Sequence, residues 1–146
     1  MTNKHCELAV IIVNYKTPRM VVDVLNSLKH EVDTLDACVV IVDNDSQDDS
    51  VVQINEWILA EDKKQKFKLV DSSSNSGFSG GNNAGINAVS ADYYLLLNSD
   101  TIVRPRALEM LLETLKNNPE AGLVGARLEW PDGKPQESCF HFHTPV

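Results

Sequence analysis

The chain has 146 residues, of which 42% are hydrophobic and 23% charged, and its formal net charge is -8. That length suits one domain, which buries about 70% of the surface of its unfolded chain, so we expect an ordinary globular core. The excess of negative charge argues against nucleic acid and anionic membranes as bulk partners, because both repel an acidic surface. The apolar run at residues 8–13 is too short to cross a bilayer or to form the core of a signal peptide.

Apolar runs and helical patterns alternate along the chain. Continuous apolar or β-branched runs predict buried strands at 8–13, 38–42, 67–70, 93–97 and 122–126. Helical spacing of apolar residues predicts helices that begin at Pro18, near residue 50, near Ala84 and at Pro105, and a turn is expected at 131–133. Strands that alternate with helices predict an α/β fold with a mainly parallel sheet flanked by helices.

Polar clusters follow three of the predicted strands, at residues 14–15, 43–45 and 98–100. Ligands of parallel sheets bind beyond the carboxyl ends of the strands, where the ends of neighbouring strands meet. We therefore expect these clusters to converge on one edge of the sheet and to form a binding site there.

Asp43 has two interpretations. Its carboxylate can accept a hydrogen bond from a ring N–H of a nucleotide base, such as N3 of uracil or thymine. Alternatively, residues 43–46 make an ordinary turn that caps the next helix, and turn chemistry alone favours this second interpretation.

Asp100 also has two interpretations. A carboxylate oxygen suits a hard divalent cation, which would bridge a diphosphate and stabilise it as it leaves. The alternative is a turn at the strand end in which Asp100 or Thr101 caps the helix that Pro105 helps to begin.

A glycine-rich segment spans residues 75–85 and runs into the short helix expected from about Ala84. Glycines allow backbone amides to approach a phosphate, and the following helix offers its positive end. The segment has neither the G-x-G spacing of a dinucleotide fingerprint nor a P-loop, because Ile86 and Asn87 stand where Lys and Ser or Thr are required. A surface loop without a ligand stays open as the alternative.

Cysteine and histidine patterns give little sign of metal or redox chemistry. Cys6, Cys38 and Cys139 have no C-x-x-C spacing, so we expect plain thiols, with Cys38 buried, in a reducing cytoplasm. His141 and His143 form an H-x-H pair, which we interpret as part of an ordinary tail rather than a metal site.

Four ordered motifs together resemble family 2 glycosyltransferases, in particular their rhamnosyltransferase-like branch. They are residues 10–15 (VIIVNY), 41–46 (IVDNDS), 75–85 (NSGFSGGNNAG) and 95–101 (LLLNSDT), and the later turn at 131–133 (PDG) also matches. The resemblance extends from about residue 8 to residue 144.

The resemblance implies the GT-A fold, a Rossmann-like sheet that binds a nucleoside-diphosphate sugar and a divalent metal. By position, Asn14 and Tyr15 would line the base pocket and Asp43 would contact the base. Residues 98–100 stand at the D-x-D position of the family, so Asp100 would hold Mn²⁺ or Mg²⁺ and Asn98 would face the ribose or the sugar. The first position is Asn rather than Asp, which leaves one carboxylate fewer for the metal.

The glycine-rich segment would contribute further donor contacts in this interpretation. Residues 77–83 would form a loop near the nucleotide or the donor sugar, and the expected binding residues are Asn75, Gly77, Gly81 and Asn82.

The implied activity is inverting transfer of a sugar from a UDP- or dTDP-linked donor, such as dTDP-rhamnose, to a polysaccharide or a lipid-linked acceptor. The family's general base would lie beyond Val146, and the acceptor-binding part is expected to be missing. We therefore expect residues 1–146 to form one donor-binding domain that binds nucleotide without transferring sugar. A truncated GT-A domain would also expose core surface and self-associate.

The expected location is the cytoplasm, including the inner face of the membrane. Two other classes stay open from the sequence. One is a nucleotidyltransferase, which would want a basic, glycine-rich loop after the first strand, where this chain has residues 14–18. The other is a non-catalytic nucleotide-binding domain, which would share the same binding half.

Overall fold

The computed structural model of the chain describes residues 5–137. Cys139, His141 and His143 therefore lie outside the described residues. The chain divides into two compact units between Glu109 and Met110, and each unit is described here by itself.

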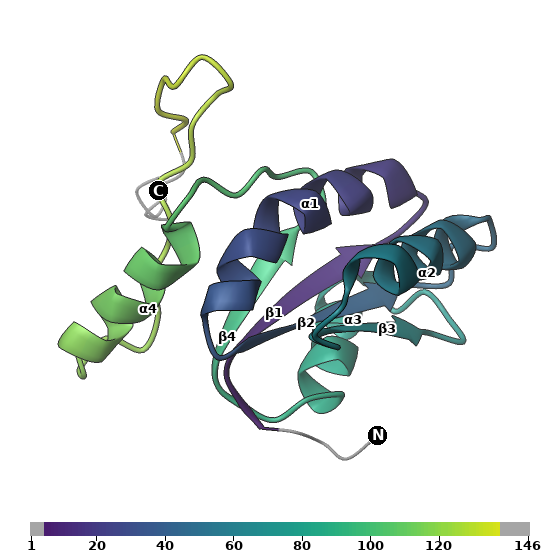
Figure 1. The fold of residues 1–146 in the computed structure, drawn as a ribbon, viewed down its shortest axis with the longest axis horizontal. Helices are drawn as coiled ribbons and strands as arrows, with labels where there is room; N and C mark the ends of the chain where they lie inside the picture. Colours follow the sequence, from purple (N-terminus) through teal and green to yellow (C-terminus); the bar gives the residue numbers. More distant parts are fainter. Residues whose placement is uncertain (1–4, 138–146) are drawn as a thin grey trace, which may run out of the picture. The chain divides into compact units, whose positions relative to one another are not determined.

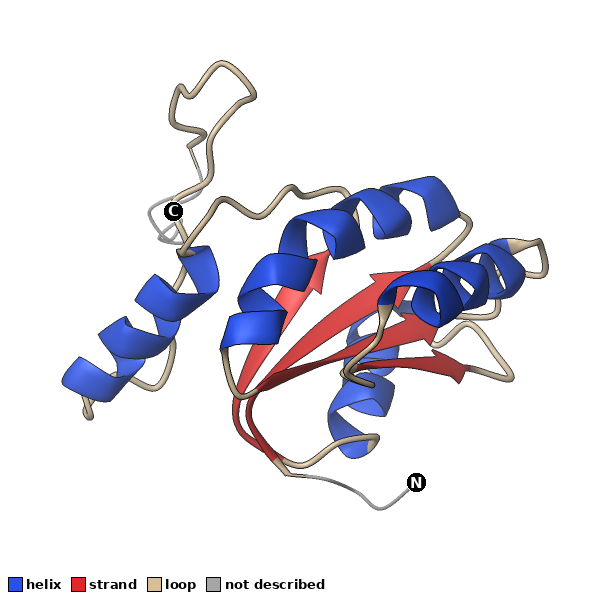
Figure 2. Ribbon diagram, viewed as in Figure 1, coloured by secondary structure: helices blue, strands red, loops and turns tan. Residues whose placement is uncertain are grey.

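Four parallel strands form the sheet of the first unit. They are β1 (Cys6–Asn14), β2 (Ala37–Asp43), β3 (Phe67–Asp71) and β4 (Ala91–Asn98), in the spatial order β3-β2-β1-β4 (Figure 2). All three strand pairs run parallel, with β1 and β2 in the centre. The predicted parallel α/β sheet is thus confirmed, as are its first four strands.

Helices cover both faces of this sheet. α1 (Pro18–Thr34) and α2 (Ser50–Glu61) lie on one face, and α3 (Gly77–Asn87) lies on the other (Figure 1). α4 (Ala107–Asn117) follows β4 and crosses the boundary between the two units. Within residues 5–137, no helix is both long enough and apolar enough to pass through a bilayer.

The hydrophobic core has one cluster on each face of the sheet. On the α1 side, alternate residues of β1 and β2 pack against the apolar stripe of α1, and Trp57 of α2 packs edge-on against Phe67. On the α3 side, the other residues of the same strands, including Ile11 and Val42, pack against the helix. Burial on both faces explains why β1 and β2 are continuous apolar runs, since each buried Val or Ile contributes about 1.5–3 kcal/mol.

The glycine-rich segment is helical where the sequence predicts a loop. α3 begins at Gly77, so residues 77–83 belong to the helix, and the expected helix start near Ala84 is wrong. Gly81 and Gly85 lie four residues apart on the side of α3 that meets β1. A Cβ at Gly81 would lie 2.8 Å from Val13 Cγ1, and one at Gly85 would overlap Ile11 Cγ2. These glycines allow α3 to approach the sheet closely.

The second unit contains no further strand of the sheet among its described residues. Residues 122–126, predicted as a fifth strand, are irregular, and Leu123 is exposed. A β-strand needs a partner strand for its backbone groups, and these residues pair with none in the described part. The predicted turn at 131–133 is present, closed by a bridge between Glu129 and Pro135.

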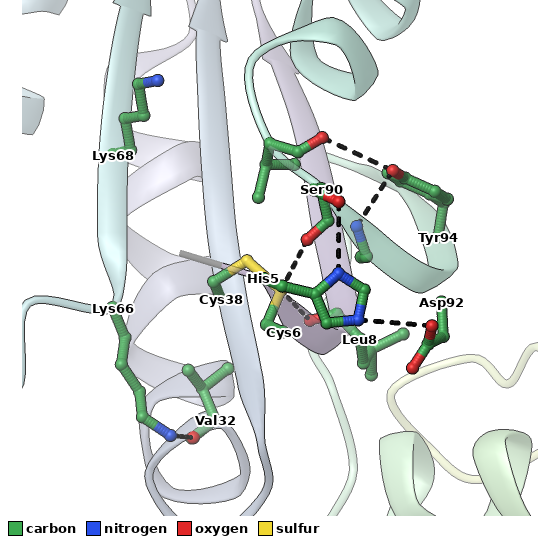
Figure 3. Close-up of a disulfide and its surroundings, with 12 residues drawn as sticks. His5, Cys6, Leu8, Val32, Cys38, Lys66, Lys68, Ser90, Asp92 and Tyr94 are labelled. Atoms are coloured by element: carbon green, nitrogen blue, oxygen red, sulfur yellow. Dashed lines mark hydrogen bonds and ion pairs between the residues drawn. A yellow bond between two sulfur atoms is a disulfide. The ribbon is translucent and has the colours of Figure 1, made fainter. Parts of the chain in front are cut away.

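The expectation of plain thiols is wrong for two of the cysteines. Cys6 on β1 and Cys38 on β2 are joined in a disulfide, with their Cα atoms 6.4 Å apart. Figure 3 shows this pair beside His5, whose ring contacts Ser90 and Asp92. Adjacent strands bring together cysteines that are 32 residues apart, which the C-x-x-C criterion does not detect.

The close packing of α3 gives a stability prediction. We expect Gly85→Ala to lower the free energy of unfolding by about 1–2 kcal/mol, measured by urea denaturation. Overpacking against Ile11 costs about 1–3 kcal/mol, and the better helix propensity of alanine returns up to about 1 kcal/mol.

Gly125→Ala is the matched control, because a Cβ there meets no atom within 4 Å. Its effect should stay within about 0.5 kcal/mol. A Gly85→Ala protein more stable than the parent would show that α3 does not pack on β1 as described.

Candidate functional site

The predicted polar clusters meet at one edge of the sheet. Asn14 is the register partner of Asp43, and Asp43 is in turn the partner of Asp71. On the other side of β1, Val13 is opposite Asn98. The carboxyl ends of β1, β2 and β4 therefore present polar groups side by side, as the sequence predicts, and Asp71 of β3 adds a fourth polar end that was not predicted.

Asp43, Asn14 and Ser46 form a buried network, which we call the Asp43 cluster. Asn14 Nδ2 and Ser46 Oγ each donate a hydrogen bond of 2.6 Å to Asp43 Oδ1, and the Ser46 N–H donates one of 3.0 Å to Oδ2. All three side chains are at most 2% exposed. Residues 43–46 thus form the predicted turn, which Asp43 also ties to the end of β1. They do not cap the next helix as predicted, because α2 begins at Ser50 and its N-cap is Asp49.

The turn after β1 is held by the same cluster. Asn14 Oδ1 accepts hydrogen bonds from the N–H and the hydroxyl of Thr17, both at 3.2 Å, and Ser46 Oγ accepts one from the Lys16 N–H at 3.0 Å. Tyr15 is 46% exposed, and Lys16 Nζ lies 5.2 Å from the centre of its ring. The Tyr15 ring is thus available at the surface of the edge.

The backbone of these two turns is strained. Lys16, Asp45 and Gln47 all have left-handed φ angles, of 60°, 60° and 55°. Non-glycine residues in this region cost about 1–3 kcal/mol each and gather where a site requires a particular geometry. The strain marks the turns after β1 and β2 as candidate functional segments.

Asn44 joins the end of β2 to the glycine-rich segment. Its amide donates hydrogen bonds to Asn75 Oδ1 at 2.8 Å and to the Gly77 carbonyl at 3.2 Å, and its Oδ1 accepts the Ser76 N–H at 3.2 Å. Asn75 and Gly77, both predicted site residues, are therefore placed at the strand ends. Sequence reasoning gave Asn44 no role, although its position inside the 41–46 motif was the available signal.

Two further predicted residues lie on α3. Gly81 packs against Val13, as described above. Asn82 is buried and donates to the Phe78 carbonyl at 2.9 Å, while its Oδ1 has no hydrogen-bond partner within the described part of the chain. A buried amide oxygen without a partner is a place where a ligand hydroxyl or a water molecule would bind.

The turn after β4 carries Asn98, Ser99 and Asp100. Ser99 Oγ lies 3.4 Å from Thr17 Oγ1, and Thr101 Oγ1 donates to the Asn98 carbonyl at 2.8 Å. α4 begins only at Ala107, so the predicted capping role of Asp100 or Thr101 is wrong. The first amides of α4 bond instead to Glu31 of α1.

The oxygen atoms at this edge suit a divalent cation that is coordinated partly by the protein and partly by a bound phosphate ligand. Asp100 is exposed, and the structure records no bond to its side chain from the described residues. No group of three or more His, Cys, Asp or Glu residues within 5–137 forms a metal cage. One carboxylate with open coordination fits Mg²⁺ or Mn²⁺, because such ions take their remaining ligands from phosphate and water.

The electrostatics of the edge favour the same interpretation. Asp43 and Asp71 end two of the strands, and Asp100 follows a third. Ser50, whose backbone N–H donates a hydrogen bond of 2.9 Å to Asp48 Oδ1, lowers the pKa of Asp48 from its ordinary value. An anionic ligand at such an edge requires a cation to offset the repulsion.

A cavity of about 350 Å³ lies elsewhere, at the carboxyl end of α1. None of the predicted site residues lines it; its lining is His30, Glu31, Thr34, Leu35, Pro105, Arg106 and Glu109.

The Asp43 cluster gives the prediction for this site. Asp43→Asn should lower the free energy of unfolding by about 2 kcal/mol in urea denaturation, because an amide nitrogen cannot accept the bonds that one carboxylate oxygen now accepts. Asp45→Asn is the control, because among the described residues the Asp45 carboxylate accepts side-chain hydrogen bonds from Gln47 alone. This substitution should change the free energy of unfolding by no more than about 0.5 kcal/mol. Equal effects of the two substitutions would contradict the hub role of Asp43.

Comparison with known proteins gives one family and several relatives. The family described as glycosyl transferase family 2 matches residues 9–138. Poly-beta-1,6-N-acetyl-D-glucosamine synthase of Staphylococcus epidermidis is 33% identical over 85 residues, which are 58% of this chain and 20% of that protein. The chain thus spans about a fifth of the length of this relative.

Solved structures show the same fold. S. aureus TarS residues 1–349 in complex with UDP matches with a TM-score of 0.63 and 21% identity, over 77% of this chain and 33% of that chain. A mannosyltransferase of Pyrobaculum calidifontis in complex with GDP-Man and Mn²⁺ matches with a TM-score of 0.68 and 16% identity, over 88% and 37%. The expected GT-A fold is thus confirmed, and the match over residues 9–138 places the chain in glycosyl transferase family 2.

Proposed function

We propose that this chain binds a nucleoside-diphosphate sugar at the carboxyl edge of its sheet and provides the donor site of an inverting glycosyltransferase. The observation that carries the proposal is the convergence of three segments. The Asp43 cluster, the Asn75–Gly77 backbone held by Asn44 and the turn bearing Asp100 come from different parts of the chain and meet at one edge.

The nucleoside would bind over β1 and β2. Asp43 Oδ2 accepts one hydrogen bond in the structure, and a carboxylate oxygen has two lone pairs, so an acceptor position remains for a ring N–H of the base. The exposed Tyr15 ring and Asn14 would complete the base pocket. Asn75, Gly77, Gly81, Asn82 and Asn98 would surround the ribose, the diphosphate and the sugar.

Asp100 would hold Mn²⁺ or Mg²⁺ between the protein and the diphosphate. Such a cation neutralises the charge that develops on the leaving diphosphate. The residues of this chain would contribute the rest: Asp100 fixes the place of the cation, and Asn98, opposite Val13 at the end of β4, would orient the sugar next to it.

The donor class follows from the chemistry of the base contact. An acceptor-only carboxylate suits the N3–H of uracil or thymine, which favours a UDP- or dTDP-linked sugar, with dTDP-rhamnose suggested by the motif resemblance. The UDP bound to the similar TarS structure supports the first of these. The GDP-Man bound to the mannosyltransferase makes GDP the comparison ligand for any test.

Sugar transfer needs a general base for the acceptor hydroxyl and an acceptor site in addition to a donor site. The chain spans about a third of the similar solved chains. The proposal for residues 1–146 is accordingly confined to binding of the donor. The acceptor in the whole protein would be a polysaccharide or its lipid-linked precursor, a proposal supported by the polysaccharide named for the relative in S. epidermidis.

Two accompanying proposals concern location and assembly. We propose the cytoplasm, including the inner face of the membrane, as the location of the donor site. Because Cys6 and Cys38 form a disulfide, these cysteines no longer indicate a reducing compartment. Exposed apolar side chains, among them Leu96 on the edge strand β4 and Leu123, favour self-association.

Calorimetric titration with UDP, dTDP and GDP, each with and without Mn²⁺, tests the donor site. One pyrimidine diphosphate should bind best, and Mn²⁺ should tighten its binding at least about tenfold, which is about 1.4 kcal/mol. Asp100→Ala should remove the effect of Mn²⁺, because it removes the exposed carboxylate of the β4 turn.

Asp92→Ala is the matched control, since Asp92 is an exposed carboxylate at the opposite end of β4. It should leave both affinities within about twofold of the parent protein. A folded parent protein that binds no nucleoside diphosphate under any of these conditions would refute the proposed function.

A further inference from the structure

Glu31 is a buried carboxylate that the donor site does not use. It lies on the sheet-facing side of α1, between Leu28 and Val32, and is 7% exposed. Its two oxygens accept the N–H groups of Ala107 at 3.1 Å and Leu108 at 2.8 Å. These are the first amides of α4, which have no partner within the helix and form its positive end, so the buried charge is compensated.

Ser27, one turn before Glu31 on α1, also bonds to the chain between β4 and α4. Ser27 Oγ accepts the Val103 N–H at 3.0 Å while its own hydroxyl donates to the Val24 carbonyl at 2.7 Å. At the start of α1, Thr17 lies against Ser99. Residues 99–108, which we call the Asp100 segment, are thus bonded to Ser27 and Glu31 of α1 and to Thr17, the residue just before this helix.

The Asp100 segment contains little regular secondary structure of its own. Between β4 and α4, residues 101–104 have no regular secondary structure, and Arg106 has a left-handed φ of 67°. Irregular backbone needs partners for its amides, and here α1 supplies them. Asp100 lies three residues before the Ser27 contact and seven before the first Glu31 contact, so its place depends on how α1 anchors the segment.

We propose that Glu31 and Ser27 are positioning residues that set the place of Asp100, and through it the affinity of the donor complex for its divalent cation. The inference rests on the proposed function, since it assigns a role to residues that act on the proposed metal ligand. Neither Glu31 nor Ser27 is proposed to contact the cation or the nucleotide. Glu31 acts through the amides of α4, and Ser27 acts through the amide of Val103.

The test compares three variants of the full chain. Glu31→Gln keeps the size of the side chain but turns an NH₂ group toward the α4 amides, and Ser27→Ala is the milder change that removes the acceptor for Val103. Glu56→Gln is the control, because it makes the same change of charge on the exposed side of α2. Two quantities are measured: amide hydrogen exchange in the Asp100 segment, and the Mn²⁺ concentration that half-saturates nucleotide binding.

The expected result separates positioning from general stability. In Glu31→Gln the amides of residues 103–108 should exchange faster, and the half-saturating Mn²⁺ concentration should rise about tenfold, in keeping with loss of hydrogen bonds to a charged group. Nucleotide affinity without Mn²⁺ should stay within about twofold of the parent protein. Ser27→Ala should change both quantities in the same direction but less, and Glu56→Gln should change neither.

A double variant, Glu31→Gln with Asp100→Ala, tests whether Glu31 acts through Asp100. If Glu31 acts through Asp100, Glu31→Gln should cause no further loss of Mn²⁺ dependence in the Asp100→Ala background. Faster exchange with an unchanged Mn²⁺ requirement would overturn the inference and leave Glu31 a purely structural cap. Equal weakening with and without Mn²⁺ would also overturn it. Failure of the proposed function is distinct, because it would appear in the parent protein as an absence of Mn²⁺-dependent binding.

Discussion

The candidate site depends on one buried carboxylate. Asp43 accepts three hydrogen bonds from two partners, Asn14 and Ser46, and these partners belong to the turns after the two central strands. A carboxylate with so little access to water is stable because these three hydrogen bonds compensate for its lost hydration. The turns next to this cluster contain Lys16, Asp45 and Gln47 in left-handed conformations, and Ser46 Oγ also accepts the N–H of Lys16. In the proposed donor site, the atoms that recognise the base would also be the atoms that hold the local fold.

Gly81 and Gly85 have a packing role in the fold. In a phosphate loop, glycines bring backbone amides to the ligand; here Gly81 and Gly85 bring α3 to Val13 and Ile11. In the proposed site, the diphosphate would instead be bound by polar side chains and by a cation at Asp100. A cation would also offset the negative charge of this edge, where carboxylates end or follow three of the four strands.

The sequence predicts those features that a local pattern determines. β1 and β2 are buried on both faces, so they appear as unbroken apolar runs and were found within two residues at each end. Residues 122–126 have a similar pattern, but a strand also needs a partner, which no local pattern reveals. The helical start of α3 was missed because glycine has a low helix propensity, although glycines four residues apart at 77, 81 and 85 were a helical signal.

For the site too, the sequence predicts the residues at the strand ends but not the partners that they contact in the folded chain. The motifs placed Asn14, Asp43, Asn75 and Asp100 at one edge, since the ends of parallel strands must meet there. Their partners were not predictable, because Asn44, Ser46 and Glu31 act through contacts that only the folded chain creates. Glu31 in particular is 76 residues from Ala107, and its one sequence signal is a charged residue on the apolar stripe of α1.

The strand order has a consequence for how the protein is made. β1 lies between β2 and β4, and Cys6 pairs in register with Ala91. On the ribosome, β1 and β2 can pair early, but the second neighbour of β1 is synthesised only after three helices have followed it. Contacts so distant in sequence form slowly, since the loop between them must close first. The half of the edge that carries Asp100 is thus the last to be assembled in a nascent chain, after the Asp43 cluster already exists.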